Sequence, residues 1–184
     1  MTLWVVRHAQ PLIAPGICYG ALDVLAGAQA TQHAAEKLAV ELPLGIAVLT
    51  STLQRCEQLA QDLYGLRPDL TIQHESRLVE MNFGVYEGIT WADIPKDALD
   101  AWTADFVHHR FGGQESVAQF MARVAEVWDE WHAQASGSQG QAWITHAGVV
   151  RAATLLQQGV RIPESALHWP VQAPGFGQWI VLPN

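Results

Sequence analysis

Histidine and arginine side chains stand directly after short apolar runs at three places in this 184-residue sequence. Arg7 and His8 follow the first run, Ser51 and then Arg55 follow the second, and His146 follows the third. Guanidinium groups bind phosphate through paired hydrogen bonds, and a neutral imidazole can act as a nucleophile. If the three places meet in space, these residue types form a site for one phosphate group.

The three apolar runs, residues 3–6, 46–49 and 142–145, are typical of strands that are buried on both faces of a parallel sheet. Helical signals follow the runs, and alternation of strands with helices is typical of layered α/β folds. In open α/β sheets, ligands bind beyond the carboxyl ends of the strands. The sequence therefore predicts an α/β fold with a crevice that receives the two histidines and the two arginines.

Further elements follow from periodicity and from glycine and proline stop signals. Ser116 is a good N-cap for a long amphipathic helix through about residue 135, and the Ser/Gly segment 136–140 ends it. The other predicted elements are helices over about residues 29–42, 53–63, 91–109 and 149–158 and strands over residues 70–72 and 176–182.

The composition argues against several classes of protein. Hydrophobic residues make up 49% of the chain and charged residues 15%, which suits one globular domain over residues 1–184. The net charge of −8 argues against nucleic-acid binding. No apolar run reaches the roughly 20 residues that span a membrane, and the opening segment is too short for a signal peptide. We therefore expect a cytoplasmic protein that binds neither nucleic acid nor membrane.

The two cysteines, Cys18 and Cys56, form no disulfide framework and no zinc-binding pattern in the sequence. His108 and His109 are adjacent, but no further ligand lies at a suitable spacing. The sequence thus predicts no metal and no cofactor, and it leaves the oligomeric state open.

Four blocks resemble those of the histidine phosphatase superfamily, also called phosphoglycerate mutase-like, and they occur in the family's order. Residues 6–10, Val-Arg-His-Ala-Gln, resemble its Arg-His-Gly-Glu/Gln signature, and residues 51–55, Ser-Thr-Leu-Gln-Arg, resemble the second block. Residues 78–88 resemble the third block, and residues 145–149, Thr-His-Ala-Gly-Val, resemble the last. The resemblance implies a three-layer α/β/α fold with a mostly parallel central sheet.

The resemblance also implies a role for each main candidate. His8 would be the nucleophile that accepts the phosphoryl group, and nearby cations would keep its ring neutral. Arg7, Arg55 and a protonated His146 would bind the equatorial oxygens, and Glu80 would protonate the leaving alcohol. Water would then hydrolyse the phosphohistidine, and no metal would take part.

Three further residues are candidate substrate ligands: Gln10, Ser51 and Glu115. Ser51 suits a helix N-cap equally well. Glu87 matches the family's third block, and we expect it to order a loop rather than to take part in catalysis.

The chain departs from the family pattern at three alanines. Ala9 and Ala147 replace glycines beside the two histidines, and Ala14 lies where many members carry a phosphate-binding asparagine. The sequence leaves open whether another donor replaces that asparagine.

Two short segments resemble the α-ribazole phosphatase branch, which serves cobalamin biosynthesis. They are residues 16–20, Gly-Ile-Cys-Tyr-Gly, and residues 111–116, Phe-Gly-Gly-Gln-Glu-Ser. In the family, the region that corresponds to about residues 89–115 covers the pocket. Its aromatic side chains suit either stacking on a benzimidazole ring or burial in a core helix.

The favoured interpretation is a phosphatase that acts on a small phosphorylated metabolite, with α-ribazole 5′-phosphate as the named candidate. One alternative is a phosphoglycerate mutase, and another is a broad-specificity sugar or metabolite phosphatase. The last is a catalytically silent binding module. Inactive relatives typically lose the nucleophile or an arginine, and this chain keeps both.

Overall fold

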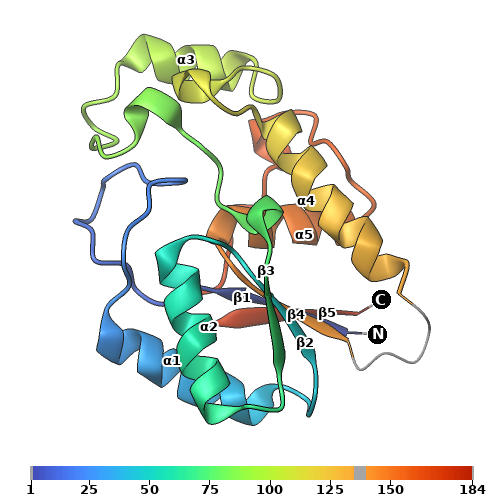
Figure 1. The fold of residues 1–184 in the computed structure, drawn as a ribbon. Helices are drawn as coiled ribbons and strands as arrows, with labels where there is room; N and C mark the ends of the chain where they lie inside the picture. The colour runs from blue at the N-terminus through green and yellow to red at the C-terminus, as the bar shows by residue number, and fades with distance from the viewer. Residues whose placement is uncertain (1, 135–139, 184) are drawn as a thin grey trace.

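The computed structural model describes residues 2–134 and 140–183, and its centre is a five-stranded sheet in the order β3-β2-β4-β1-β5 (Figure 1). Strands β1 to β4 pair in parallel, and β5 pairs antiparallel with β1. The strands are β1 Thr2–Arg7, β2 Ala47–Thr50, β3 Thr71–His74, β4 Gln141–Thr145 and β5 Trp179–Pro183. The mostly parallel sheet that the sequence predicts is confirmed.

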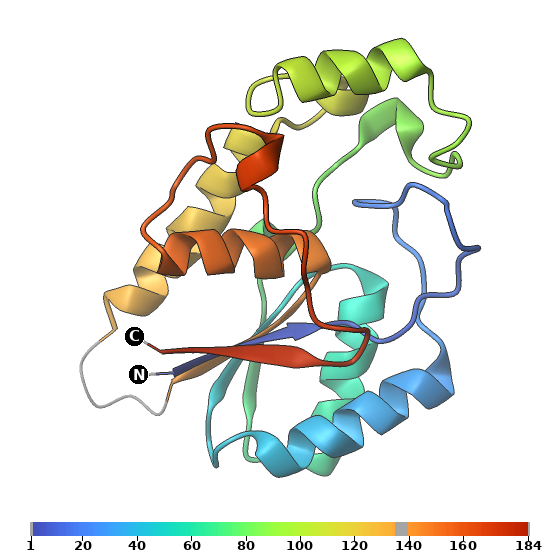
Figure 2. The same cartoon turned by 180° about the vertical axis from the view of Figure 1, so that it is seen from behind.

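Helices cover both faces of the sheet and give three layers (Figures 1 and 2). The α-helices are α1 Ala28–Glu41, α2 Gln54–Leu66, α3 Lys96–Ala104, α4 Val117–His132 and α5 Ala147–Gln157. Alternate strand residues point to opposite faces, so Val5 packs in the core with α4 and α5, whereas Val6 packs with α1 and α2. In the described part of the chain, no helix is long and apolar enough to cross a membrane.

Ser116 caps α4 as the sequence predicts. Its hydroxyl accepts a hydrogen bond from the N–H of Gln119, and the Gln119 side chain accepts one from the N–H of Ser116, which makes a capping box. The predicted end of this helix at residue 135 and residues 136–139 of the predicted stop segment lie outside the described residues.

The predicted helix over residues 91–109 is wrong in extent, because only residues 96–104 are helical. The chain before it forms a turn, in which the Thr90 hydroxyl accepts a hydrogen bond from the N–H of Asp93. Pro95 then occupies the N-cap position, and Asp105 ends the helix with a φ of −131° and a ψ of 62°.

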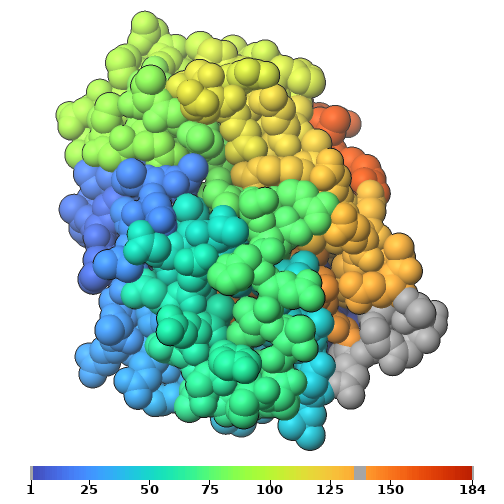
Figure 3. All heavy atoms as spheres, in the orientation of Figure 1, coloured from blue at the N-terminus to red at the C-terminus, as the bar shows by residue number. Residues whose placement is uncertain are grey.

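The segment around α3 lies against the loop that follows β1. The N–H of Cys18 donates to the carbonyl of Ile89 at 2.7 Å, and the N–H of Gly88 donates to the carbonyl of Cys18 at 2.8 Å. Figure 3 shows this contact as light-green atoms directly above blue ones. Three short 3-10 helices, η1 Ser76–Leu78, η2 Gly84–Tyr86 and η3 Phe111–Gly113, connect β3, this segment and α4.

Candidate active site

Three neighbouring strands, β2, β4 and β1, deliver the candidate residues to one edge of the sheet. His8 follows β1, Ser51 follows β2, and His146 follows β4 as the N-cap of α5. The backbone ladder continues past the strands, because the N–H of His8 donates to Thr145 and the N–H of Ser51 donates to Ile144, both at 2.9 Å. Adjacent strands lie roughly 4.8 Å apart, so the side chains that follow them come into contact.

The two histidines form a buried pair. The centroids of the His8 and His146 rings lie 5.2 Å apart, and the two residues are 2% and 0% exposed. Arg55 is also fully buried, and its Nε donates to Nδ1 of His146 at 3.2 Å. The structure therefore brings together two imidazoles and a guanidinium group that are far apart in the chain.

The ring of His8 is neutral and presents one free nitrogen. Its Nδ1 lies 2.7 Å from the carbonyl oxygen of Ala9, which can only accept a hydrogen bond, so Nδ1 carries the proton and Nε2 keeps its lone pair. Burial, together with the charges of Arg55 and Arg7, lowers the pKa of His8 to about 3. A neutral imidazole with a free Nε2 is the form that can attack phosphorus.

The ring of His146 is neutral with both nitrogens engaged. Because Nδ1 accepts from Arg55, the proton lies on Nε2, which donates to the hydroxyl of Ser51 at 2.8 Å. Burial and the Arg55 charge lower the pKa of His146 well below its ordinary value. A second positive charge beside Arg55 is disfavoured where water is excluded, so this arrangement favours the neutral ring. The protonated His146 that the sequence predicts concerns the binding of a phosphate group and stays a prediction.

Backbone carbonyls hold the guanidinium group of Arg55 in place. Its Nη1 and Nη2 donate to the carbonyl oxygens of Leu22 and Gly20, at 2.8 and 2.6 Å. The carboxylate of Glu87 in turn accepts hydrogen bonds from the backbone N–H groups of residues 20–22. These contacts agree with the loop-ordering role that the sequence predicts for Glu87.

Arg7 reaches the site from the end of β1. Its Nη1 donates to the carbonyl of Pro174 at 3.0 Å, and its guanidinium carbon lies 3.9 Å from the centre of the Phe176 ring, a cation–π contact. The same ring lies 5.6 Å from that of His8. Arg7 and the nucleophile candidate thus share one aromatic neighbour.

The carboxylate of Glu80 lies at the N-terminus of α5. It accepts hydrogen bonds from the N–H groups of Gly148 and Met81, at 2.9 and 3.0 Å. A Cβ atom at position 148 would lie 2.1 Å from Oε1 of Glu80, so this close approach requires glycine. Because Gly148 comes two residues after His146, the contact places the Glu80 carboxylate at the border of the histidine pair.

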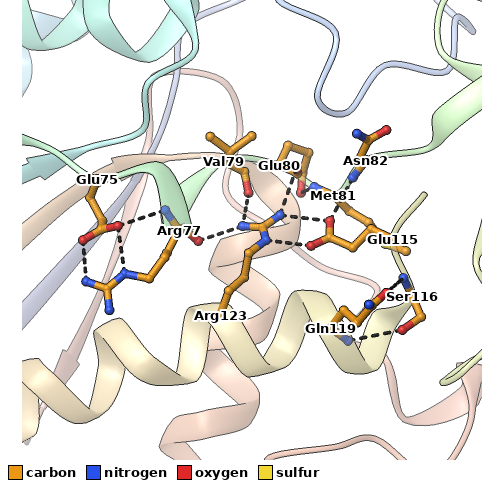
Figure 4. Close-up of polar contacts among 10 residues, drawn as sticks. All are labelled: Glu75, Arg77, Val79, Glu80, Met81, Asn82, Glu115, Ser116, Gln119 and Arg123. Carbon is orange, nitrogen blue, oxygen red and sulfur yellow. Dashed lines mark hydrogen bonds and ion pairs between the residues drawn. The ribbon is translucent and has the colours of Figure 1, made fainter.

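Gln10 and Glu115, the other two predicted substrate ligands, make their hydrogen bonds with residues other than the two histidines. Gln10 is exposed, and its backbone carbonyl accepts a hydrogen bond from Gly27. The carboxylate of Glu115 pairs with Arg123 at 2.7 Å and accepts from the N–H of Asn82 at 3.0 Å (Figure 4). Glu115 therefore links Arg123 of α4 to the loop that carries Glu80.

Sequence reasoning does not select two aromatic residues that border the site. The Phe176 ring contacts Arg7, and the Tyr19 ring centre lies 5.4 Å from the guanidinium carbon of Arg55. Both belong to loops, where no periodicity marks a residue. The only sequence signal is that Tyr19 falls within the 16–20 segment that resembles one branch of the family.

A family model described as the histidine phosphatase superfamily (branch 1) matches residues 3–172 of the chain. A Hydrogenobacter thermophilus protein named "Putative phosphoserine phosphatase 2" is 30% identical over 166 residues, which cover 86% of this chain and 79% of the relative. The chain belongs to the histidine phosphatase superfamily. Family membership and this phosphatase-named relative support the assignment of the chain as a phosphatase.

Solved structures share the fold over nearly the whole chain. A mycobacterial glucosyl-3-phosphoglycerate phosphatase superposes with a TM-score of 0.78 at 24% identity, and the match covers 98% of this chain and 88% of the other. A Thermus thermophilus protein superposes with a TM-score of 0.72 at 25% identity, with 98% and 92% covered. These likenesses confirm the predicted phosphoglycerate mutase-like α/β fold.

Proposed function

We propose that this phosphatase hydrolyses phosphomonoesters of small metabolites through a phosphohistidine formed on Nε2 of His8. The observation that carries the proposal is the state of the ring, whose Nδ1–H is committed to the carbonyl of Ala9 while Nε2 retains its lone pair. Arg7 and Arg55 supply positive charge beside it, where the equatorial oxygens of a phosphoryl group need stabilisation.

The reaction has two steps. In the first, Nε2 of His8 attacks phosphorus, the ester bond to the leaving oxygen breaks, and a protonated Glu80 gives its proton to the leaving alcohol. In the second, water attacks the phosphohistidine, the phosphorus–nitrogen bond breaks, and Glu80 takes a proton from the water. Inorganic phosphate then leaves, and both His8 and Glu80 return to their starting states.

A cavity of about 120 Å³ beside Glu80 supports a proposal about the alcohol part of the substrate. Aromatic side chains make up much of its wall: Phe83, Trp102, Phe106, Phe120 and Trp169. Because the proton donor must touch the leaving oxygen, the alcohol lies next to this wall. We infer that the alcohol carries an apolar or aromatic part, since aromatic faces bind such groups by stacking and by burial.

Within that class, α-ribazole 5′-phosphate is our named candidate. The support comes from the 16–20 and 111–116 segments, which resemble the α-ribazole phosphatase branch, and from the aromatic wall, which suits a benzimidazole ring. The proposal keeps the cytoplasmic location that the sequence predicts.

Release of inorganic phosphate from a panel of phosphomonoesters tests the proposal. The panel contains α-ribazole 5′-phosphate, phosphoserine, 3-phosphoglycerate, sugar phosphates and 4-nitrophenyl phosphate, with the His8→Ala variant as the inactive control. We expect phosphate release, with a preference of tens of fold for α-ribazole 5′-phosphate. Similar rates for all esters would indicate a broad-specificity phosphatase. Isomerised phosphoglycerate without free phosphate would indicate a mutase, and no turnover of any ester would indicate a binding module.

A further inference from the structure

Arg123 reaches from α4 to three backbone carbonyl oxygens, one in η1 and two in the following loop that carries Glu80 (Figure 4). Its Nη1 donates to the carbonyls of Arg77 and Val79 at 2.7 and 2.6 Å, and its Nη2 donates to the carbonyl of Glu80 at 3.1 Å. The guanidinium group is a rigid planar fork of donors. It therefore fixes the path of the loop up to the residue that carries the carboxylate.

Glu115 extends the network to the other side of Glu80. Its carboxylate accepts from Nε and Nη2 of Arg123, at 2.7 and 3.1 Å, and from the N–H of Asn82 at 3.0 Å. One ion pair thus holds backbone groups on both sides of Glu80. The two side chains are 20% and 15% exposed, so solvent and salt screen this pair less than a surface pair.

The loop depends on these contacts because residues 79–83, between η1 and η2, have no regular secondary structure. A group that delivers a proton must lie within hydrogen-bond reach of the leaving oxygen, and a displacement of about 1 Å can cost roughly 10²-fold in rate. We propose that Arg123 and Glu115 are positioning residues that aim the carboxyl group of Glu80 at the leaving oxygen. The inference rests on the proposed function, and it gives Glu115 a role other than the predicted substrate contact.

Two substrates with different leaving groups test the proposal. Nitrophenolate leaves without a proton, whereas the alkoxide of a sugar phosphate needs one. Arg123→Met should lower kcat for the sugar phosphate by roughly 10²-fold and leave kcat for 4-nitrophenyl phosphate nearly unchanged. Glu115→Gln, which keeps the shape of the side chain, should give the same pattern, and it serves as the second variant if Arg123→Met folds poorly.

Arg77→Met is the matched control. The Arg77 side chain also pairs with a residue of α4, Glu130, at 2.6 Å. Arg77 lies in η1, however, so its side chain does not hold the backbone on either side of Glu80. We expect Arg77→Met to leave the ratio of the two rates at its wild-type value. If Arg77→Met changed the ratio of the two rates, loss of any contact between η1 and α4 would be enough to impair proton transfer from Glu80. That result would contradict a specific role for Arg123.

A double variant separates positioning from a general structural role. If Arg123 acts through Glu80, adding Arg123→Met to Glu80→Gln lowers the sugar phosphate rate no further. Equal losses for both substrates in Arg123→Met, or additive losses in the double variant, would overturn the inference while leaving the proposed function in place. A Glu80→Gln variant that hydrolyses both substrates at wild-type rates would instead overturn the proposed proton donor, and the inference with it.

Discussion

The two buried histidines make the stability of the protein depend on pH. The folded protein holds His8 with a pKa of about 3, whereas an unfolded chain restores its ordinary value of 6.5. Between these values the unfolded state binds a proton that the folded state does not bind, so the free energy of unfolding falls as the pH falls. His146, whose pKa is also lowered by burial and by Arg55, contributes with the same sign.

We therefore predict that the free energy of unfolding decreases as the pH falls from 6.5 to 5. Carboxylates with lowered pKa values titrate below this window, so the decrease reports on the histidines. His8 should contribute about 1.4 kcal/mol per pH unit below pH 6, and His146 should add to the slope with the same sign. Urea unfolding at several pH values measures this slope. The His8→Gln variant keeps the size of the side chain but cannot titrate, so its slope should be shallower. Equal slopes in the two proteins would contradict the neutral buried state of His8.

The role of Glu80 as proton donor predicts a dependence on the leaving group. Glu80→Gln should reduce kcat for alkyl phosphates by roughly 10²–10⁴-fold, the usual contribution of general acid catalysis. For 4-nitrophenyl phosphate the loss should be small, because its leaving group needs no proton. Steady-state rates on the two substrates measure the difference, and equal losses would show that Glu80 acts in some other way.

Among single residues, the sequence could identify those that carry the chemistry but not those that hold them. The two histidines and Arg55 stand out because each follows an apolar run. Arg123 occupies a partly exposed position on an amphipathic helix and looks there like an ordinary surface charge. Its partners are backbone carbonyls of a distant loop, and no side-chain pattern in the sequence encodes such a contact.

At the scale of the element, the loop at residues 20–22 links Glu87 to Arg55, and this link gives a further prediction. The two carboxylate oxygens of Glu87 accept hydrogen bonds from four backbone N–H groups, those of residues 20–22 and of Phe83, and a glutamine at position 87 keeps only one acceptor oxygen. Glu87→Gln should therefore make the carbonyls that hold Arg55 more mobile. Inorganic phosphate should then bind less tightly, with a larger inhibition constant, and the free energy of unfolding should fall by about 1–3 kcal/mol. Competitive inhibition and urea unfolding measure the two effects.

Glu57→Gln is the control for this prediction, because Glu57 lies on α2, which also carries Arg55, but its side chain is 40% exposed and pairs with His74. Phosphate inhibition should be unchanged in the control. A Glu87→Gln variant with wild-type phosphate inhibition would show that the Arg55 position does not depend on this loop.

The positions of strands could be predicted better than the extent of the irregular segments. The bounds of the three apolar runs agree with those of β1, β2 and β4 to within one or two residues. A parallel strand that is buried on both faces has a continuous hydrophobic sequence, which makes it easy to recognise. The helix predicted over residues 91–109 is longer than the observed α3. The turn at Thr90 and Pro95 at the N-cap set the first residue of α3, and periodicity alone does not reveal this start.

At the scale of the whole molecule, convergence of the site follows from the order of the strands. The sequence gives no direct information on this order, but parallel neighbours end at the same edge of a sheet, so residues 8, 51 and 146 meet once β2, β4 and β1 are adjacent. The segment before α3 contacts the loop after β1 through a few backbone hydrogen bonds, and pairing of that kind between two loops could not be predicted from either segment alone.

The most direct test of the account is to trap the phosphoenzyme and locate its phosphorus atom. Rapid mixing with substrate, denaturation in alkali and NMR of the isolated peptide would show which atom carries the phosphoryl group. The account predicts one acid-labile phosphoryl group on Nε2 of His8, and none in the His8→Ala variant. Phosphate on Nδ1 of His8, phosphate on another residue, or turnover by His8→Ala at the wild-type rate would contradict it.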